Sequence, residues 1–399
     1  MISVSTVLVM AGQGIIAPIL PAFAKDFGVS TAMVGLTMTS FALSRMVLNI
    51  PLGLASDRYG RRVLLIGGPL VTAVGMFGSG LSFDIWQLMA WRFIAGAGSA
   101  MYMTGAQIYL VDVSTPDTRA MFLGTNQMAI NLGISLGPGI GGLIAQVFGL
   151  RVPFHVVGVA AVLTALYAYT RLPETRHLAA EELRQSRTAV SPATHERAWL
   201  QMIRSRAFLA LAILTMMIFF TRGASRQTLI PLIAIDQLGM STGLLGGFLM
   251  AASLVMMVLL PPAAFVADRF GRAWAIVPGG VITGLVLIGL GNVDSITPFF
   301  VLGLMLSVGF GFIGPAPAAF AAEIAPPELR GLAMGFYRTA GDFGLLIGAP
   351  LLGLIADHSS FGWALSTNGL LLIASVIFFG LVANAWRPPS HVPAPTHSS

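Results

Sequence analysis

The chain has 399 residues, of which 56% are hydrophobic and only 10% are charged. A soluble domain carries about 25% charged residues, so this composition excludes an ordinary soluble protein and requires much of the apolar surface to face lipid. The formal net charge is +6, yet the basic residues are dispersed over short loops, which excludes the basic face of a nucleic-acid-binding protein.

Long apolar segments predict an all-α membrane protein with twelve spanning helices, because a span needs about 20 mostly apolar residues. Lipid offers no partner to exposed backbone groups, which excludes open strands within the spans. The first apolar segment has no basic n-region, so we interpret it as a span and not as a cleavable signal peptide. The expected spans are 2–23, 31–55, 62–83, 86–110, 120–146, 151–171, 207–231, 242–266, 273–292, 297–321, 331–356 and 361–385.

The distribution of basic residues predicts the orientation. Arginines crowd the loops on the side of the two termini, whereas the loops of the other side hold only Lys25 and Arg151. The positive-inside rule then places both termini and the central loop in the cytoplasm. We expect six-helix bundles at 1–171 and 207–386, a cytoplasmic linker at 172–206, and a disordered cytoplasmic tail at 387–399 that is rich in Pro, Ser and His.

The sequence contains an internal repeat, with two copies of a unit of roughly 200 residues. A shift of 211 positions, without a gap, turns 57–61 (Asp-Arg-Tyr-Gly-Arg) into 268–272 (Asp-Arg-Phe-Gly-Arg), and turns Ser30 and Thr31 into Ser241 and Thr242. Solenoid repeats run about 20–50 residues, so the period excludes a solenoid. In so apolar a chain it indicates a transporter of two parallel halves, whose motif copies lie on one face of the membrane.

The segment 53–62, Gly-Leu-Ala-Ser-Asp-Arg-Tyr-Gly-Arg-Arg, joins spans two and three. It resembles the G-x-x-x-D-R-x-G-R-R signature of the major facilitator superfamily, and the span count and the repeat agree with that family over essentially the whole chain. The resemblance implies two parallel six-helix bundles and secondary transport. It also implies that the motif is a conformational latch, which stabilises the outward-facing state and breaks on inward opening.

The chemistry of the latch can be read from its residue types. Asp57 can accept from the N-terminus of a neighbouring helix, Gly53 allows helices to approach, and Arg61 can pair with an acid at the end of span four. The alternative is a purely topological role, in which the arginines hold the loop inside. The second copy is weaker, because alanine replaces its first glycine and its last arginine. The expected latch residues are Gly53, Asp57, Arg58, Gly60, Arg61 and Asp112, with Asp268, Arg269, Gly271, Arg272 and Glu323 in the second copy.

Two further motifs resemble signatures of the same family. Arg92 in span four is followed by small residues and implies a part in proton coupling; the alternative is an arginine that snorkels to the outer interface. Span five carries the antiporter pattern G-x-x-x-G-P-x-x-G-G, whose glycines make a flat face and whose proline allows a bend. In family terms this face packs across the two halves of proton-coupled exporters. Its residues are Gly133, Gly137, Pro138, Gly141 and Gly142.

Few charged residues are expected deep within the membrane-spanning helices. Asp342 lies about three turns from Arg330 and is the one acid near mid-membrane, so we take it as the candidate proton site; Arg338 lies at i,i−4 and can pair with it. The alternative is a purely structural ion pair. Deep arginines outnumber this acid, which argues against a cationic drug and favours a carboxylate, another anionic group or a neutral amphiphile. The expected cavity residues are Gln13, Arg45, Asn49, Gln107, Asn126, Gln127, Asn131, Arg222, Arg226, Gln227 and Tyr337, each of which could equally be a packing contact.

The leading hypothesis is a multi-pass protein of the bacterial inner membrane that exports a small organic or drug-like compound in exchange for protons, by rocking two halves around a central site. We expect a functional monomer whose partners are the bilayer, the substrate and protons, with the proton gradient as energy source and neither cofactor nor metal. The first alternative is proton-coupled uptake or exchange of an organic anion. A membrane enzyme would need a metal cluster or acid/base pair, which the sequence does not offer. A non-transporting receptor or scaffold remains the alternative of another class, because fold does not fix function.

Overall fold

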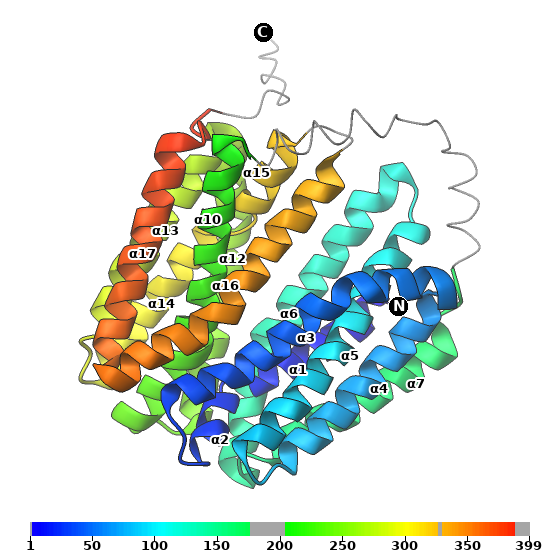
Figure 1. Ribbon diagram of the computed structural model, residues 1–399, viewed down its shortest axis with the longest axis horizontal. Helices are drawn as coiled ribbons and strands as arrows, with labels where there is room; N and C mark the ends of the chain where they lie inside the picture. Colours follow the sequence, from blue (N-terminus) through cyan, green and yellow to red (C-terminus); the bar gives the residue numbers. More distant parts are fainter. Residues whose placement is uncertain (1, 176–203, 326–328, 388–399) are drawn as a thin grey trace.

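The computed structural model describes residues 2–175, 204–325 and 329–387, and every regular element in these ranges is helical (Figure 1). The first half contains α1 (Ile2–Ile16), α2 (Leu20–Lys25), α3 (Thr31–Tyr59), α4 (Arg61–Gly80), α5 (Ile85–Asp112), α6 (Pro116–Phe148) and α7 (Val152–Arg171). The second half contains α10 (Arg206–Thr221), the π-helical η1 (Arg222–Leu229), α11 (Ile230–Leu232), the π-helical η2 (Ile233–Gln237), α12 (Thr242–Phe270), α13 (Arg272–Leu290), α14 (Ile296–Ile313), α15 (Ala316–Ile324), α16 (Arg330–His358) and α17 (Phe361–Val382).

The helices confirm the predicted all-α membrane fold. Within the described ranges, ten helical runs are long and apolar enough to cross a membrane, and α1 and α5 occupy the other two expected spans. The first span is broken between α1 and α2, next to Pro18 and Pro21. The tenth span is broken between α14 and α15 at Gly314, whose φ of +39° glycine adopts without strain. Most of the expected linker (172–206) and of the tail (387–399) lies outside the described residues.

The repeat is visible in how equivalent helices begin. The hydroxyl of Ser30 accepts from the Met33 N–H at the start of α3, and the hydroxyl of Ser241 accepts from the Leu244 N–H at the start of α12. These serines are N-caps, which satisfy a backbone donor that the first turn leaves free. A serine N-cap therefore begins α3 and α12 at equivalent positions of the repeat.

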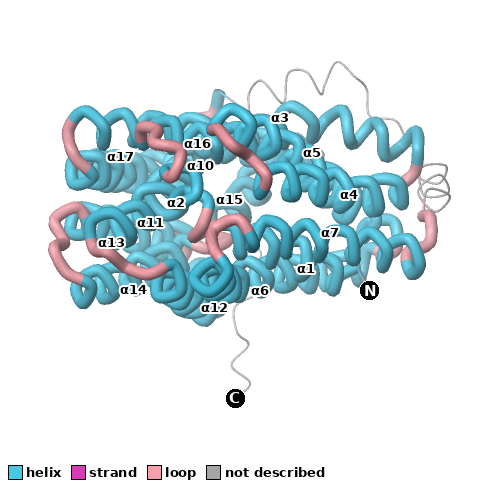
Figure 2. The backbone as a smooth tube through the Cα atoms, turned by 90° about the horizontal axis from the view of Figure 1, so that it is seen from below, coloured by secondary structure: helices cyan, strands magenta, loops and turns pink. Residues whose placement is uncertain are grey.

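The helices gather into two bundles, as Figure 2 shows. In the first half, α4 packs against α5 and α7, α1 against α6, and α3 against α5. In the second half, α13 packs against α14 and α17, α10 against α16, and α12 against α14. The main contacts between the bundles join α3 to α16 and α6 to α12.

The backbones of the two bundles approach most closely on one side of their interface. We call the face with the loops at Gly60 and Gly271 the motif face, and the opposite face the closed face. Near the closed face, a Cβ added at Gly35 of α3 would lie 2.6 Å from the Ala349 carbonyl carbon of α16, and one added at Gly142 of α6 would lie 2.8 Å from the Gly246 Cα of α12. Backbones can approach so closely only where residues are small.

Helix ends add a polar clamp to the closed face. The Asp357 carboxylate, at the end of α16, accepts from the backbone N–H groups of Thr31 (2.8 Å) and Ala32 (2.9 Å) in the first turn of α3. Gln146, its repeat equivalent at the end of α6, accepts from the hydroxyl of Ser241 at 3.4 Å. An anion at a helix N-terminus is stabilised by the free N–H groups and the helix dipole. The structure therefore has its closed face sealed and its bundles diverging toward the motif face (Figure 1).

Replacing Gly246 with leucine is expected to separate the bundles at the closed face, because its side chain would be forced into the Pro138 carbonyl and Gly142. Overpacking of this kind costs about 1–3 kcal/mol, enough to shift a two-state population by roughly 5- to 150-fold. Spin labels on Phe83→Cys and Asp294→Cys, both exposed at the closed face, would report a longer distance. The chain has no native cysteine, so the labels are unique.

The neighbouring Gly247 provides the matched control. A Cβ at Gly247 meets nothing within 4 Å, so Gly247→Leu adds the same side chain to the same helix without a clash. Equal distance distributions for the two leucine variants would contradict the role of the Gly142–Gly246 contact.

Replacing Asp357 with asparagine is expected to open the closed face as well. The neutral amide weakens two charge-assisted hydrogen bonds to the first turn of α3, each worth about 1.5–3 kcal/mol. The same label pair would show a larger population of long distances. Asp236→Asn removes an exposed carboxylate near the closed face without touching α3, and it should leave the distribution unchanged. A distribution for Asp357→Asn that matches the parent would exclude a clamp.

Candidate functional site

A cavity of about 310 Å³ lies between the bundles. It is lined by α1, α3, α5 and α6 of the first half and by α10, η1, α12 and α16 of the second. Small-molecule sites typically enclose about 300–1,000 Å³. The expected residues that line it are Gln13, Arg45, Arg92, Asn131, Arg222, Arg226, Gln227 and Asp342.

Several polar residues expected at the cavity lie elsewhere. Asn126 is buried in the first bundle, where it accepts from the Thr6 hydroxyl at 2.8 Å. Gln127 is exposed and donates to Asn131 at 3.2 Å. Tyr337 packs against the core of the second bundle. None of these three side chains lines the cavity, and Asn49 and Gln107 also lie outside its lining.

The expected ion pair between Arg338 and Asp342 is not formed. The Arg338 guanidinium is exposed and donates from Nη1 to Gln107 Oε1 at 2.9 Å, which links the second bundle to the first. Asp342 faces the cavity and has no ion pair or side-chain hydrogen bond among the described residues. The charges of Arg45 and Arg338 nevertheless act on its carboxyl group. The i,i+4 spacing permits a pair but does not require one, because a long side chain can turn toward either neighbour.

Arg92 is buried and does not snorkel to an interface. Its side chain borders the cavity from α5 with 6% of the residue exposed, and its guanidinium carbon lies 4.5 Å from the centroid of the Phe41 ring. The ring attracts the cation without neutralising it. Its Nε has no hydrogen-bond partner.

Arg222 and Arg226 project from the π-helical segment η1. Thr221 donates to Asn368 at 3.0 Å, and Asn368 donates to Ser225 at 2.6 Å, so a buried polar network fixes both ends of the segment's first turn. Single π-helical turns inside helices are frequent at functional sites. The widened turn therefore places two arginines at the cavity. No sequence pattern predicts such a turn here, because its residues are ordinary helix residues.

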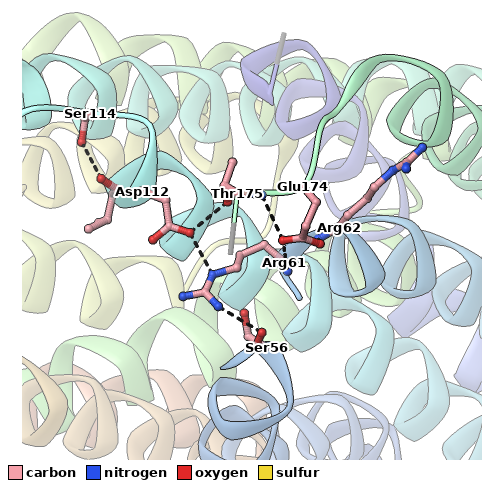
Figure 3. Close-up of polar contacts among 8 residues, drawn as sticks. Ser56, Arg61, Arg62, Asp112, Ser114, Glu174 and Thr175 are labelled. Carbon is pink, nitrogen blue, oxygen red and sulfur yellow. Dashed lines mark hydrogen bonds and ion pairs between the residues drawn. The ribbon is translucent and has the colours of Figure 1, made fainter. Parts of the chain in front are cut away.

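The first latch copy is an ion pair within one bundle (Figure 3). The Arg61 guanidinium donates from Nε to Asp112 Oδ2 at 2.8 Å and from Nη1 to the Ser56 carbonyl at 3.2 Å. The two side chains are only 6% and 5% exposed. Because α4 and α5 both belong to the first bundle, this pair is intact while the motif face is open. The expectation that it breaks on such opening is therefore wrong for this pair.

Glu174, which the sequence reading missed, completes this site. Its carboxylate accepts from the backbone N–H groups of Arg61 (2.9 Å) and Arg62 (3.1 Å) at the start of α4 (Figure 3). Gly60 has a φ of +95°, and a Cβ there would collide with this carboxylate. The sequence does contain a signal for this contact. An acid follows the end of α7 on the membrane face where α4 begins, and an acid can stabilise the N-terminus of a helix.

Other latch residues make fewer contacts than expected. A Cβ added at Gly53 would meet nothing within 4 Å, so this glycine permits no close approach while the bundles diverge. Arg58 and Arg269 are exposed. The side chain of Asp57 lies outside the described residues, and its expected contact with a helix N-terminus stays a prediction.

The second latch copy has the same plan with weaker chemistry. Arg272 pairs with Asp268 and donates from Nε to Glu323 Oε1 at 3.0 Å, but Asp268 and Glu323 are far more exposed than Asp112. Gly271 repeats the turn with a φ of +117°. The carbonyl of Ala385, at the repeat position of Glu174, accepts from the Ala273 N–H at 2.9 Å and so replaces a charged cap with a neutral one.

The glycines of the antiporter pattern divide between two partners. Gly133, Gly137 and Gly141 pack against α1 within the first bundle, where added Cβ atoms would meet the backbone of 7–15. Gly142 and the Pro138 carbonyl, by contrast, contact α12 of the other bundle. The expectation that the whole face packs across the halves is therefore wrong, because residues four apart share one helix face and Gly142 lies on the next.

Comparisons with known proteins agree with the bundles and the repeated motifs. An uncharacterized MFS-type transporter of Methanocaldococcus jannaschii is 26% identical over 363 residues, which span 89% of this chain and 90% of that protein. The quinolone resistance protein NorA of Staphylococcus aureus is 26% identical over 357 residues, or 88% of this chain and 87% of NorA.

Solved structures share the fold. A bacterial homolog of the human lysosomal transporter Spinster, in an inward-facing and occupied conformation, superposes with a TM-score of 0.76 at 16% identity and covers 96% of this chain and 94% of its own. The xylose transporter XylE from E. coli, in an inward open conformation, gives 0.73 at 14% identity and 96% of both chains. The human organic anion transporter MFSD10 gives 0.67 at 16% identity, over 95% of this chain and 97% of its own.

The sequence profile described as Major Facilitator Superfamily matches residues 2–260 and 219–398. The two matched ranges together span nearly the whole chain, in agreement with its two bundles. The chain is an integral membrane protein of the transporter type and belongs to the Major Facilitator Superfamily.

Proposed function

We propose that this protein exports a small organic compound in exchange for protons. The observation that carries the proposal is Asp342, the carboxylate that lines the central cavity in the described part of the chain and has no ion pair there. A carboxyl group that faces the cavity between the bundles can bind a proton or a ligand, and rocking of the bundles exposes it to each face in turn. The proton gradient is then the energy source, and no cofactor is required.

The direction of transport is part of the proposal. The antiporter pattern on α6 supports export, and the resistance named for the relative NorA is consistent with moving a compound out of the cell. The basic loops support termini in the cytoplasm of a bacterial inner membrane. With that orientation, the motif face is cytoplasmic and the structure is open toward the interior. Each chain holds a complete cavity, which supports a functional monomer.

Proteoliposomes test the coupling. With acid inside the vesicle, an exchanger accumulates substrate as protons leave, and with acid outside it does not. A fluorescent quinolone, an indole carboxylate and a cationic dye form a suitable first panel. Accumulation of a compound with acid inside, abolished by a protonophore, supports export by exchange. Accumulation only with acid outside would contradict it.

Uptake of an organic anion together with protons is the second candidate. The surplus of arginines over acids at the cavity favours it. It predicts the reverse dependence, with accumulation only when the acid is outside. The same vesicles therefore separate the two functions.

A further inference from the structure

The lining of the central cavity is unbalanced in charge. Arg45, Arg92, Arg222 and Arg226 border it, against one carboxylate, Asp342, among the described residues. No ion pair within the described ranges joins any of these five side chains. Uncompensated charge within a membrane is costly and typically marks a site that binds a substrate, an ion or a proton. A ligand with an anionic group would supply the missing charge.

Neutral contacts orient two of these arginines, Arg92 against the Phe41 ring and Arg226 in the second bundle. Arg226 donates to the Ser253 hydroxyl at 3.1 Å, and its guanidinium lies 5.8 Å from the Phe310 ring centroid. The Nε atoms of Arg45 and Arg92 are buried without a hydrogen-bond partner. A guanidinium has five N–H donors, so these contacts orient the groups and leave donors for a ligand.

The charged groups form a series across the bundle interface. Arg226 acts electrostatically on Arg222, and Arg222 acts on Arg45 of the other bundle. Arg45 in turn acts on Asp342, where the series changes sign. A ligand that spans this series would have guanidinium groups along one part and the Asp342 carboxylate at the other end.

Exchange with protons adds a second requirement. A purely anionic ligand binds the arginines best when Asp342 is protonated, because an ionised Asp342 repels the ligand and competes for Arg45. Such a ligand would travel with the proton. A basic nitrogen reverses this dependence, because an ammonium group pairs only with ionised Asp342 and is displaced when that carboxyl group takes up a proton.

We infer that the cavity takes zwitterionic organic compounds, whose anionic group binds Arg222, Arg226 and Arg45 and whose basic nitrogen binds Asp342. The apolar wall of Phe41, Phe219 and Met256 accommodates a flat hydrophobic body. This inference rests on the proposed exchange function and names its substrate class. A compound with only a positive charge is disfavoured by the arginines.

Three indoles test the assignment by direct binding to the purified full-length protein. Tryptophan has both charges, indole-3-propionate only the carboxylate, and tryptamine only the amine. Calorimetry at neutral pH is expected to rank tryptophan first and tryptamine last. Arg222→Gln should weaken tryptophan and indole-3-propionate by roughly 10- to 100-fold and leave tryptamine unchanged or improved. Arg226→Gln should act in the same direction and serves if the first variant does not fold.

Asp342→Asn separates the two ends of the site. It should remove the advantage of tryptophan over indole-3-propionate and should strengthen the binding of indole-3-propionate. Arg204→Gln is the control, because Arg204 is exposed outside the cavity and its loss removes the same charge. Strongest binding by tryptamine, equal binding of all three indoles, or no binding of either carboxylate at millimolar concentration would overturn the inference.

The binding and transport experiments distinguish a failure of the ligand assignment from a failure of the exchange function. The predicted ranking without proton-driven accumulation in vesicles would reject the exchange function and keep the ligand assignment. Proton-driven accumulation of the cationic dye, with no preference for tryptophan, would keep the exchange function and reject the ligand assignment.

Discussion

Asp342→Asn is expected to abolish proton-driven accumulation of substrate in vesicles. Asparagine keeps the size of the side chain but cannot bind and release a proton, so the gradient has no group to act on. Asp342 is the acid that borders the cavity in the described chain, and no other described carboxylate there can replace it. The expected loss is complete for accumulation with acid inside.

Exchange without a gradient provides the internal control for this variant. Labelled and unlabelled substrate can trade places across the membrane without net proton movement, so Asp342→Asn should retain measurable counterflow of any compound that it still binds. A variant that keeps neither activity points to misfolding, which a melting curve in detergent would show. If Asp342→Asn still concentrates substrate against a pH gradient, the proton site lies elsewhere.

Asp112→Asn is expected to lower the stability of the first bundle by about 1.5–3 kcal/mol, because it weakens a buried, charge-assisted hydrogen bond from the Arg61 guanidinium. Thermal unfolding in detergent would measure the loss. The repeat supplies the matched control, since Glu323→Gln removes the equivalent acid beside Arg272. That acid is 33% exposed, so its pair should contribute only about 0–1 kcal/mol.

The difference between these two variants tests the asymmetry of the latch copies. Equal destabilisation by Asp112→Asn and Glu323→Gln would contradict the argument from burial. If Asp112→Asn loses transport at temperatures where the protein remains folded, the Arg61–Asp112 pair has a role in the transport cycle as well as a structural role.

Much of the fold was predictable from the sequence, because lipid restricts the choices. The apolar lengths predict the spans, and α3, α7 and α12 begin within one residue of the expected positions. The repeat predicts that Arg61–Asp112 and Arg272–Glu323 are equivalent pairs, and both are formed. Local patterns of length, charge and period carry this information.

The contacts between elements were less predictable. The spacing of Arg338 and Asp342 permits a pair, but the structure shows Arg338 bound to Gln107 of the other bundle. Glu174 and Asp357 each bind the start of a helix remote in sequence, and such a partner is fixed only by how the helices pack in three dimensions. Met38 and Met256 line the cavity, yet nothing in the sequence distinguishes them from methionines that face lipid.

Paired distance measurements would show whether the two bundles rock about the shared cavity. Spin labels on Tyr59→Cys and Phe270→Cys would report the motif face, and labels on Phe83→Cys and Asp294→Cys the closed face; all four positions are exposed. Acidification or addition of a bound compound is expected to change the two distances in opposite directions. Distances that lengthen or shorten together, or that stay fixed under every condition that supports transport, would contradict the account.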